Sequence, residues 1–296
     1  MLHLRRILFP TDYSACAEHA FDHAAFLGAQ FDAELHVLHV EAPVDAIEDE
    51  PTEPRPHSLS DEDAAFVRLI EVEKRGDSVR EVILRYARAQ DVDLIVMGTH
   101  GRRGVQHFLL GSVAERIVRE APCAVLTVGP TETTPATIQR ILAPVDFSGR
   151  SYEAVKHARA LADLYDAKVD LLHVVEATFA PDVYGLGLAW SDVIPDVIER
   201  TDEAMAEIAR DLLGERAGIT RVEVGADAAI IIEVARQKAD LIVMGTHGRT
   251  GLERFALGSV TERVVQHAAC PVFTVRSFGA SLLVGASREN ADADLT

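Results

Sequence analysis

Short apolar runs alternate along the chain with longer segments in which apolar side chains recur every three to four residues. In the first half, the apolar runs predict strands at residues 7–10, 34–40, 67–73, 94–97 and 124–128, of which the third is poorly defined. Helical periodicity predicts helices at residues 15–27, where Ser14 can cap the start, and at 79–89 and 113–120. Strands that alternate with helices indicate βαβ units and a parallel sheet.

The second half has the same order of elements, with one difference in its middle. Its strands are predicted at residues 141–144, 168–174, 221–224, 241–244 and 272–275. Residues 192–213 carry the apolar stripe of a long helix. The matching stretch of the first half, residues 41–66, holds four prolines and many acidic residues, which predicts a loop or a very short helix. We therefore expect the first half to lack most of its second helix.

The similarity of the two halves extends to the residues themselves. Residues 98–128 and 245–275 align without a gap and are identical at 19 of 31 positions. Both copies contain a Gly-x2-Gly-x9-Gly-Ser pattern, and residues 140–148 repeat the pattern of residues 6–14. The offset is 134 residues at the first strand and 147 at the glycine pattern, so the second copy carries 13 additional residues between them. A period near 140 residues is the size of a whole small domain rather than of a solenoid repeat.

The order of elements predicts two tandem Rossmann-like domains. Each is a doubly wound α/β fold with a five-stranded parallel sheet in the order 3-2-1-4-5. We expect the domains at residues 1–130 and 138–278, a linker at 129–137, and a flexible tail at 279–296. Such sheets bind ligands at the carboxyl ends of their strands, where the first and fourth strands lie side by side. Asp12, Asp146 and both glycine patterns fall at this edge.

The composition narrows the class of protein. The chain is 48% hydrophobic and 26% charged, which is enough apolar material for two cores. A net charge of −18 disfavours non-specific binding to nucleic acid or to anionic membranes. No apolar run has the length of a membrane span, and the first residues lack the features of a signal peptide, so we expect a cytoplasmic protein. Cys123 and Cys270 share one repeat position and are expected to be buried, reduced thiols.

The glycine pattern is typical of a phosphate site. Gly98 and Gly245 end the fourth strand, Gly101 and Gly248 let the backbone approach a phosphate, and Gly111-Ser112 and Gly258-Ser259 open a helix. The free amides and the positive end of that helix suit a polyphosphate. The alternative is structural, because such glycines also serve turns and such serines also cap helices.

Other polar residues at this edge have two interpretations as well. Asp12 and Asp146 can accept hydrogen bonds from ribose hydroxyls, or they can cap the following helices. Arg102 and Arg249 can reach phosphate oxygens, or they can remain solvated in the loop. His100 and His247 lie inside the loop, where contact with a ligand is one of several roles.

The chain resembles the universal stress protein family in its tandem two-domain form. The resemblance covers roughly residues 3–129 and 138–276 and rests on Pro-x-Asp after the first strand and on the glycine pattern after the fourth, each present twice. On these motifs both halves resemble the branch of the family that keeps the glycine pattern and binds ATP. The resemblance also implies that the two halves pair through residues 124–128 and 272–275 as an intramolecular pseudo-dimer.

The resemblance implies a nucleotide site in each half, with adenine held by backbone groups after the first two strands. In the second half the expected site residues are Pro144, Val145, Asp146, Val174, Val175, Met244, Gly245, His247, Gly248, Arg249, Gly258, Ser259, Val260 and Thr261. In the first half they are Pro10, Thr11, Asp12, Val40, Gly98, Gly101, Arg102, Gly111, Ser112 and Val113. Because Ala114 stands where the second half has Thr261, we expect the second site to bind more tightly.

The residues offer no convincing catalytic set and no dedicated metal site. There is no lysine of the P-loop type, and any Mg²⁺ or Mn²⁺ would be held mainly by phosphates and water. The leading hypothesis is therefore an ATP-binding sensor or regulator of a stress response, read by an unknown protein partner. A scaffold without nucleotide and a slow ATPase are the alternatives, and a homodimer of the fused chain is left open.

Overall fold

The computed structural model describes residues 1–41, 67–100, 111–130, 133–175, 190–246, 257–276 and 282–283, and only the backbone of residues 190–195. The predicted loop at residues 41–66 lies outside this part of the chain, apart from its first residue. The same is true of most of the segment expected to be a tail.

The first half forms a parallel sheet in the predicted order. Its strands are β1 (Arg6–Thr11), β2 (Glu34–Glu41), β3 (Arg68–Arg75), β4 (Leu94–Gly98) and β5 (Ala124–Val128), arranged β3-β2-β1-β4-β5. Its helices are α1 (Ala15–Phe31), α3 (Val79–Ala89) and α4 (Ser112–Glu120). The wholly apolar interior of β4 is buried, as its sequence predicts for a strand covered on both faces.

The second half repeats this arrangement and, in the part of the chain that the structure describes, adds the long helix α6 (Trp190–Ile208). Its strands are β6 (Arg140–Pro144), β7 (Lys168–Val175), β8 (Ala217–Val224), β9 (Leu241–Gly245) and β10 (Val272–Val275), in the order β8-β7-β6-β9-β10. Its helices are α5 (Gly149–Tyr165), α6 (Trp190–Ile208), α7 (Asp227–Lys238) and α8 (Ser259–His267). The predicted long helix is α6, which continues as a π-helical turn at Ala209–Leu213 and a 3-10 turn at Gly214–Arg216.

The third strand of this half begins four residues earlier than its sequence predicts. Gly218 and its neighbours suggest a loop, but they pair with β7 across an irregular register. A Cβ on Gly218 would lie 2.1 Å from Oδ1 of Asp170, so the glycine makes room for that buried carboxylate. The amide of Ile219 then donates to the same oxygen at 2.8 Å, and the guanidinium of Arg140 donates to Asp170 Oδ2.

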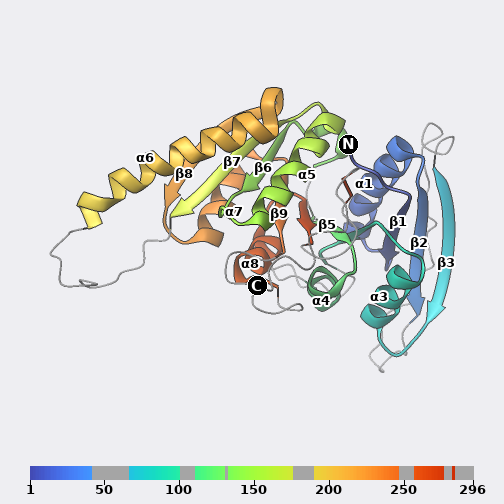
Figure 1. The fold of residues 1–296 in the computed structure, drawn as a ribbon. Helices are drawn as coiled ribbons and strands as arrows, with labels where there is room; N and C mark the ends of the chain where they lie inside the picture. Colours follow the sequence, from blue (N-terminus) through green and yellow to red (C-terminus); the bar gives the residue numbers. More distant parts are fainter. Residues whose placement is uncertain are drawn as a thin grey trace, which may run out of the picture.

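The two sheets join into one sheet of ten strands through the antiparallel pair β5 and β10 (Figure 1). Leu126 faces Phe273 in this pair, and these residues occupy the same position of the repeat, so a pseudo-twofold axis passes between them. The buried hydroxyls of Thr127 and Thr274 reinforce the pairing, because they donate across it at 3.3 and 3.1 Å. The predicted internal pseudo-dimer is therefore confirmed, and the pairing covers one edge of each half.

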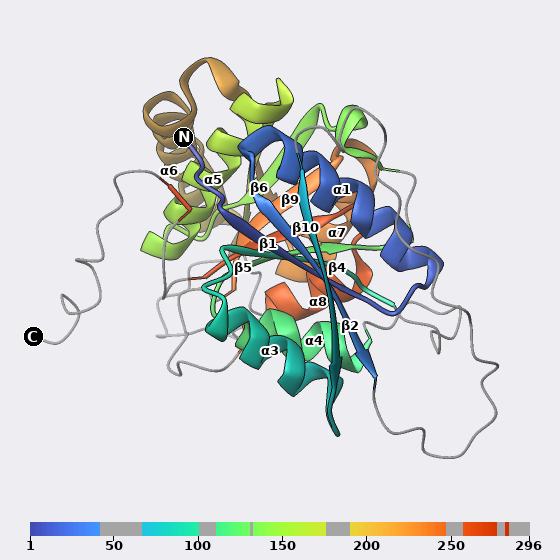
Figure 2. The same ribbon diagram turned by 90° about the vertical axis from the view of Figure 1, so that its right-hand side faces the viewer.

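Helices cover both faces of the sheet, and each face has its own core (Figure 2). The helices α1, α5 and α6 pack on one face, while α3, α4, α7 and α8 pack on the other. On the first face α1 and α5 contact each other across the pseudo-twofold axis, where the rings of Phe26 and Tyr165 stack at 5.4 Å. Both cores contain residues from the two halves, so the halves stabilise one another.

The two ends of the described chain also meet. Leu2 forms an isolated antiparallel bridge with Leu283, and the amide of His3 donates to the carbonyl of Leu282 at 2.8 Å. Burial of Leu282 holds these two residues against the N-terminal segment. None of the helices in the described ranges is both long and apolar enough to cross a bilayer.

Candidate functional site

The chain turns where the first strand of each half ends, and an aspartate stabilises the turn. Oδ1 of Asp12 accepts a hydrogen bond from the amide of Ser14 at 3.1 Å, and Oδ1 of Asp146 accepts one from the amide of Ser148 at 3.0 Å. The two serines are the N-caps of α1 and α5. The serines rather than the aspartates therefore cap the helices, and each aspartate stabilises the turn before its cap. Contact of the aspartates with a ribose stays a prediction.

A histidine that the sequence analysis did not single out holds this turn in the second half. Nδ1 of His173, near the end of β7, lies 2.7 Å from the carbonyl oxygen of Val145. Since a carbonyl can only accept, the ring donates from Nδ1. The same ring lies 4.7 Å from the ring of Phe147, whose φ of 60° is a left-handed conformation that a bulky residue rarely adopts. His173 therefore fixes the residues on both sides of Asp146.

His39 makes the same two contacts in the first half. Its Nδ1 lies 3.0 Å from the carbonyl oxygen of Thr11, and its ring lies 4.9 Å from that of Tyr13, which also has a φ of 60°. The only signal in the sequence was the repeat of the histidine at the same position of both halves. Because two copies keep the same arrangement, we interpret the histidine as the residue that positions the aspartate turn.

The glycine loop after the fourth strand is closed by a backbone hydrogen bond in both halves. The amide of Gly111 donates to the carbonyl of Thr99 at 2.8 Å, and the amide of Gly258 donates to the carbonyl of Thr246 at 2.9 Å. A Cβ on Gly111 would lie 3.1 Å from the Thr99 carbonyl oxygen. This position therefore favours glycine for closure of the loop, whether or not a ligand binds.

Gly98, at the end of β4, lies in close contact with the start of α1. A Cβ there would lie 3.1 Å from the backbone carbonyl group and from Sγ of Cys16 in the first turn of α1. The close approach brings the start of α1 against the start of the glycine loop. In the same place Oγ of Ser14 lies 3.5 Å from the carbonyl oxygen of His100. The aspartate turn and the glycine loop of the first half thus meet at one edge of the sheet, as predicted.

The serines of the glycine pattern do not cap the helices that follow them. Gly111 and Gly258 are the N-caps, and Ser112 and Ser259 are the first helical residues, with exposed side chains. The alternative that these serines cap the helices is wrong, because each helix begins one residue earlier than a serine cap requires. Neither helix has a side-chain cap in the described part of the chain. Among the described residues, the first amides of α4 and α8 therefore have no side-chain acceptor.

The threonine that distinguishes the second half has a structural partner. Oγ1 of Thr261 donates to the carbonyl of Gly245 at 2.8 Å, and its side chain is buried. Ala114, at the same position of the first half, is buried as well and lacks this bond. The hydroxyl proton of Thr261 is used in the hydrogen bond between α8 and the end of β9. The hydroxyl therefore gives no clear reason to expect tighter nucleotide binding in the second half.

The strand ends expected to hold adenine offer backbone groups, and some of these already form hydrogen bonds within the protein. The carbonyl of Val175 accepts from the amide of Gly225 at 3.1 Å, and the carbonyl of Glu41 accepts from the amide of Gly76 at 3.2 Å. Val174 is half-buried one residue before the end of β7. Any contact of these residues with a base would therefore use the remaining backbone groups.

Most other predicted site residues are buried or half-buried at the same edge. Those with buried side chains, which can offer a ligand mainly backbone groups, are Pro10, Thr11, Val40, Val145 and Met244. Those that are half-buried are Asp12, Asp146, Pro144, Val113 and Val260. Gly101, Arg102, His247, Gly248 and Arg249 lie outside the described residues.

Within the described ranges, no cluster of three or more histidine, cysteine or carboxylate side chains is arranged to hold a metal ion. The cysteines are free and buried. Burial raises the pKa of the Cys123 and Cys270 thiols to about 12, so both stay protonated at neutral pH. This agrees with the prediction of inert, reduced thiols.

Comparison with known proteins identifies the family. The model of the universal stress protein family matches residues 3–129 and 137–276. A universal stress protein of Methanocaldococcus jannaschii is 39% identical over 142 residues, which are 47% of this chain and 82% of that protein. One of Mycolicibacterium smegmatis is 31% identical over 221 residues, covering 70% of this chain and 69% of that protein.

Solved structures show the same tandem fold. The crystal structure of a putative universal stress protein from Pseudomonas aeruginosa superposes with a TM-score of 0.66 at 21% identity. The match covers 92% of this chain and 93% of that one. A universal stress protein from Archaeoglobus fulgidus matches with a TM-score of 0.60 at 20% identity, over 92% of this chain and 98% of that one.

Proposed function

The chain is a tandem member of the universal stress protein family, and on this premise we propose that it binds ATP and acts as a nucleotide-dependent regulator of a stress response. The observation that carries the proposal is the pair of helix N-termini at α4 and α8, which no side chain of the described residues caps. Each begins at a glycine, directly after the loop that its Thr–Gly hydrogen bond closes. Such an end presents amide donors and partial positive charge to an anion.

The proposed site has a place for each part of the nucleotide. The amides of the first turn of α4 or α8 would hold phosphate oxygens, because no side chain within the described ranges caps them. Asp12 or Asp146, fixed in its turn, would accept from the ribose hydroxyls. The ends of β2 and β7 would face the base. A local site of this kind is compatible with a net charge of −18, since backbone dipoles supply the attraction.

The two halves differ in their electrostatics at this end of the helix. Glu115 lies in the first turn of α4 and forms an ion pair with Arg119 at 2.5 Å. The matching Glu262 of α8 is contacted by the neutral amide of Gln266, at 3.5 Å. An unneutralised carboxylate repels phosphate, which offsets any advantage of the second site. The two sites therefore have to be tested separately.

The first helical serine allows a sharp test, because it is exposed and does not cap its helix. Ser112→Asp and Ser259→Asp each place a carboxylate beside the proposed phosphate position. An acidic residue in the first turn favours the helix by roughly 0.3–1 kcal/mol, so the fold should be kept or slightly stabilised. Ser112→Asn and Ser259→Asn are matched neutral controls of the same size.

Binding of ATP, ADP, AMP and cAMP is measured by calorimetry, with and without Mg²⁺, alongside urea unfolding of every variant. We expect saturable ATP binding in the wild type, loss of at least about tenfold in affinity in the aspartate variant of each working site, and little change in the asparagine variants. Equal ATP affinity in the wild type and in both aspartate variants would exclude these helix ends as the phosphate site. If the wild type binds none of these nucleotides, the proposal is refuted and the scaffold hypothesis is favoured.

A further inference from the structure

The ten-stranded sheet has two outer strands, β3 at one end and β8 at the other (Figure 1). Among the described residues, no strand pairs with the outer edge of either one. An open edge of this kind can pair with a strand of another chain, and folded proteins commonly protect it with charged side chains or a covering segment. The two outer strands differ in this protection.

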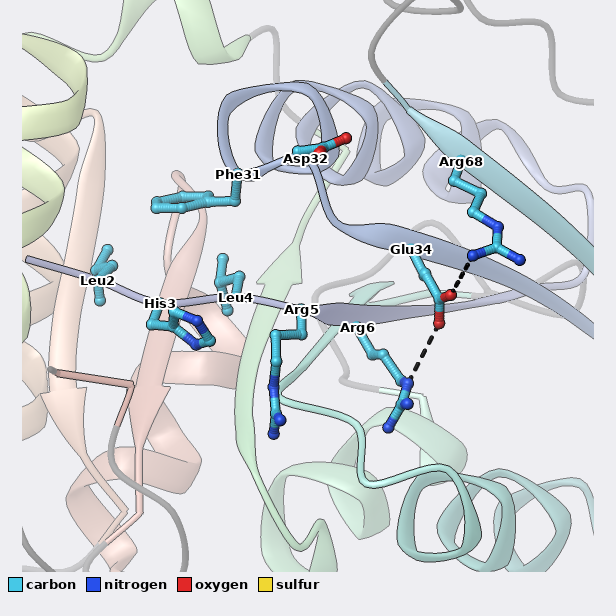
Figure 3. A pocket seen from close by; sticks show the side chains of 9 residues that line it. All are labelled: Leu2, His3, Leu4, Arg5, Arg6, Phe31, Asp32, Glu34 and Arg68. Carbon is cyan, nitrogen blue, oxygen red and sulfur yellow. Dashed lines mark hydrogen bonds and ion pairs between the residues drawn. The ribbon is translucent and has the colours of Figure 1, made fainter.

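Charged side chains protect β3. Its sequence is RLIEVEKR, in which five of the eight residues carry a charge. At its start Arg68 donates to the carboxylate of Glu34 at 2.8 Å, so an ion pair lies at this corner of the sheet (Figure 3). Antiparallel pairing of two β3 strands about their middle residues would place Glu71 or Glu73 opposite a glutamate of the second copy. Like charges in facing positions are unfavourable, so β3 is a poor surface for self-association.

The edge at β8 has less charge and more exposed apolar surface. Its sequence is AGITRVEV, with one arginine and one glutamate. Four large apolar side chains are exposed in the described part of the chain, and two of them, Ile219 at 45% and Val224 at 39%, lie on β8. A third, Val197, lies on α6, which packs on β8. Exposed apolar side chains thus gather at this edge, as is typical of a surface that contacts another protein.

The backbone of β8 shows which of its residues can pair with a further strand. The amides of Ile219 and Gly225 both point toward β7, where they donate to Oδ1 of Asp170 at 2.8 Å and to the carbonyl of Val175 at 3.1 Å. Successive residues of a strand turn their amide and carbonyl groups to opposite sides, so the even-numbered residues between these two turn theirs to the outer edge. These residues are Thr220, Val222 and Val224.

One antiparallel register between two copies of β8 combines backbone pairing with opposite charges. When the strands are centred at Val222, this residue faces its own copy and Thr220 faces Val224, and each of these pairs exchanges two hydrogen bonds. Arg221 then faces Glu223 of the second copy, twice by symmetry, at positions where facing side chains are closest. Centring the strands one residue to either side places Arg221 opposite Arg221 or Glu223 opposite Glu223. The charges therefore select the register at Val222.

The helices beside β8 leave room for a second copy. On one face α6 packs on both β8 and β7, so the twofold axis would separate it from its copy by about two strand spacings, or roughly 10 Å. Helices pack against each other at about 8–10 Å. On the other face α7 packs mainly on β6 and β7, away from the edge.

We propose that the outer edge of β8 is the docking surface for a second copy of this chain. The second copy pairs through its own β8, in antiparallel orientation, about a twofold axis at Val222. Because both copies use the same surface, the association stops at a dimer, in which the two sheets continue as one. Arg221 and Glu223 form reciprocal ion pairs across the axis. The docking is independent of the nucleotide site and needs no bound nucleotide.

The test measures the mass of the full chain without nucleotide by sedimentation velocity. Concentrations run from about 1 µM to about 500 µM, because a pair of eight-residue strands is smaller than a standard interface and binds weakly. Arg221→Glu and Glu223→Arg each place like charges opposite one another across the axis. The two variants change the net charge in opposite directions, so an effect common to both does not come from net charge. The double variant Arg221→Glu/Glu223→Arg restores the ion pairs with their signs exchanged.

The matched control is Glu73→Arg, at an exposed position of the other outer strand, β3. Urea unfolding verifies that all variants are folded. We expect a wild-type dimer with a dissociation constant in the micromolar range. Each single variant should weaken association at least about tenfold, while the double variant should return to within about threefold of the wild type and Glu73→Arg should equal it.

Four results would overturn the proposal. The first is a wild type that stays monomeric at the highest concentration. The second is a single variant, Arg221→Glu or Glu223→Arg, that associates as tightly as the wild type. The third is a double variant that associates as weakly as the single variants, which would contradict the register at Val222. The fourth is growth beyond the dimer, which would indicate a contact between β8 of one copy and β3 of the next.

Discussion

His23, in the middle of α1, is expected to make the protein less stable in acid. Its side chain is wholly buried; Nε2 lies 3.1 Å from the carbonyl oxygen of Thr133, while Nδ1 is buried with no hydrogen-bond partner in the described structure. A protonated ring would place a second N–H and a positive charge at this buried atom. Burial therefore lowers the pKa of His23 from 6.5 to about 4, with His19 adding a smaller repulsion.

The sign and size of the change in the free energy of unfolding follow from the difference in the pKa of His23 between the folded and the unfolded chain. Between pH 6.5 and 4 the unfolded chain binds a proton at His23 and the folded chain does not, so the free energy of unfolding falls as the pH falls. Above pH 7 the ring is neutral in both states and contributes nothing. At about 1.4 kcal/mol per pKa unit, the lowering to about 4 costs about 3 kcal/mol at pH 4 and below. At pH 5 the same relation gives about 2 kcal/mol.

The assay compares urea unfolding of the wild type and His23→Gln at pH 7.5 and 5.0. Glutamine keeps an amide donor near the position of Nε2 but does not titrate. Between these pH values the wild type should lose about 2 kcal/mol more than the variant. His157, at the same position of α5, is also buried with a lowered pKa, and His157→Asn serves as the comparison in the other half. If the wild type and His23→Gln lose the same free energy of unfolding between pH 7.5 and 5.0, the reasoning is refuted.

Three further predictions concern the site and the thiols. His173→Phe should keep the ring contact but lose the hydrogen bond to the aspartate turn, which costs about 1 kcal/mol of stability in urea unfolding and weakens ATP binding in calorimetry. Gly98→Ala should lower stability by about 1–3 kcal/mol, while Gly149→Ala, where a Cβ meets nothing within 4 Å, should be neutral or stabilising by about 0.5 kcal/mol in thermal unfolding. Cys123 and Cys270 should resist iodoacetamide at pH 8 in the folded protein, as followed by mass spectrometry, because burial raises the pKa of both thiols to about 12.

Each of these predictions has its own control. His173→Asn, which keeps a donor near Nδ1, should recover ATP affinity relative to His173→Phe, and failure to do so would argue against a positioning role. Equal stability of Gly98→Ala and Gly149→Ala would contradict the close approach of β4 to α1. For the thiols, urea-unfolded protein sets the reference rate, and folded protein that reacts as fast would contradict their burial.

Much of the fold could be predicted because the signals were local and appeared twice. The apolar runs of β4 and β9, the periodicity of α3 and the turn after β1 depend on residues that are neighbours in the chain. The strand order followed from the alternation of strands and helices and from the handedness of crossovers. The start of β8 was missed because Gly218 has a weak strand preference, which Asp170 outweighs by packing against it.

The candidate site was predicted in position but not in detail. The glycines and aspartates lie at the predicted edge, because strand ends and the residues after them are specified by the local pattern. The role of His173 could not be predicted, since its partner Val145 lies 28 residues away, in the turn directly after β6. Capping by the serines of the glycine pattern could not be decided from the sequence, because a cap and a first helical residue are only one position apart.

The sequence by itself determined the element types, the duplication and the edge of the sheet where polar residues gather, since these depend on interactions between residues close in the chain. Only the tertiary structure decided that β5 and β10 pair at Leu126 and Phe273, and that Leu282 and Leu283 lie against the N-terminal segment. It alone brought Arg6 of β1 and Arg68 of β3 onto the carboxylate of Glu34 in β2. Such contacts depend on packing and register between distant segments, which many sequences with the same local pattern could satisfy differently.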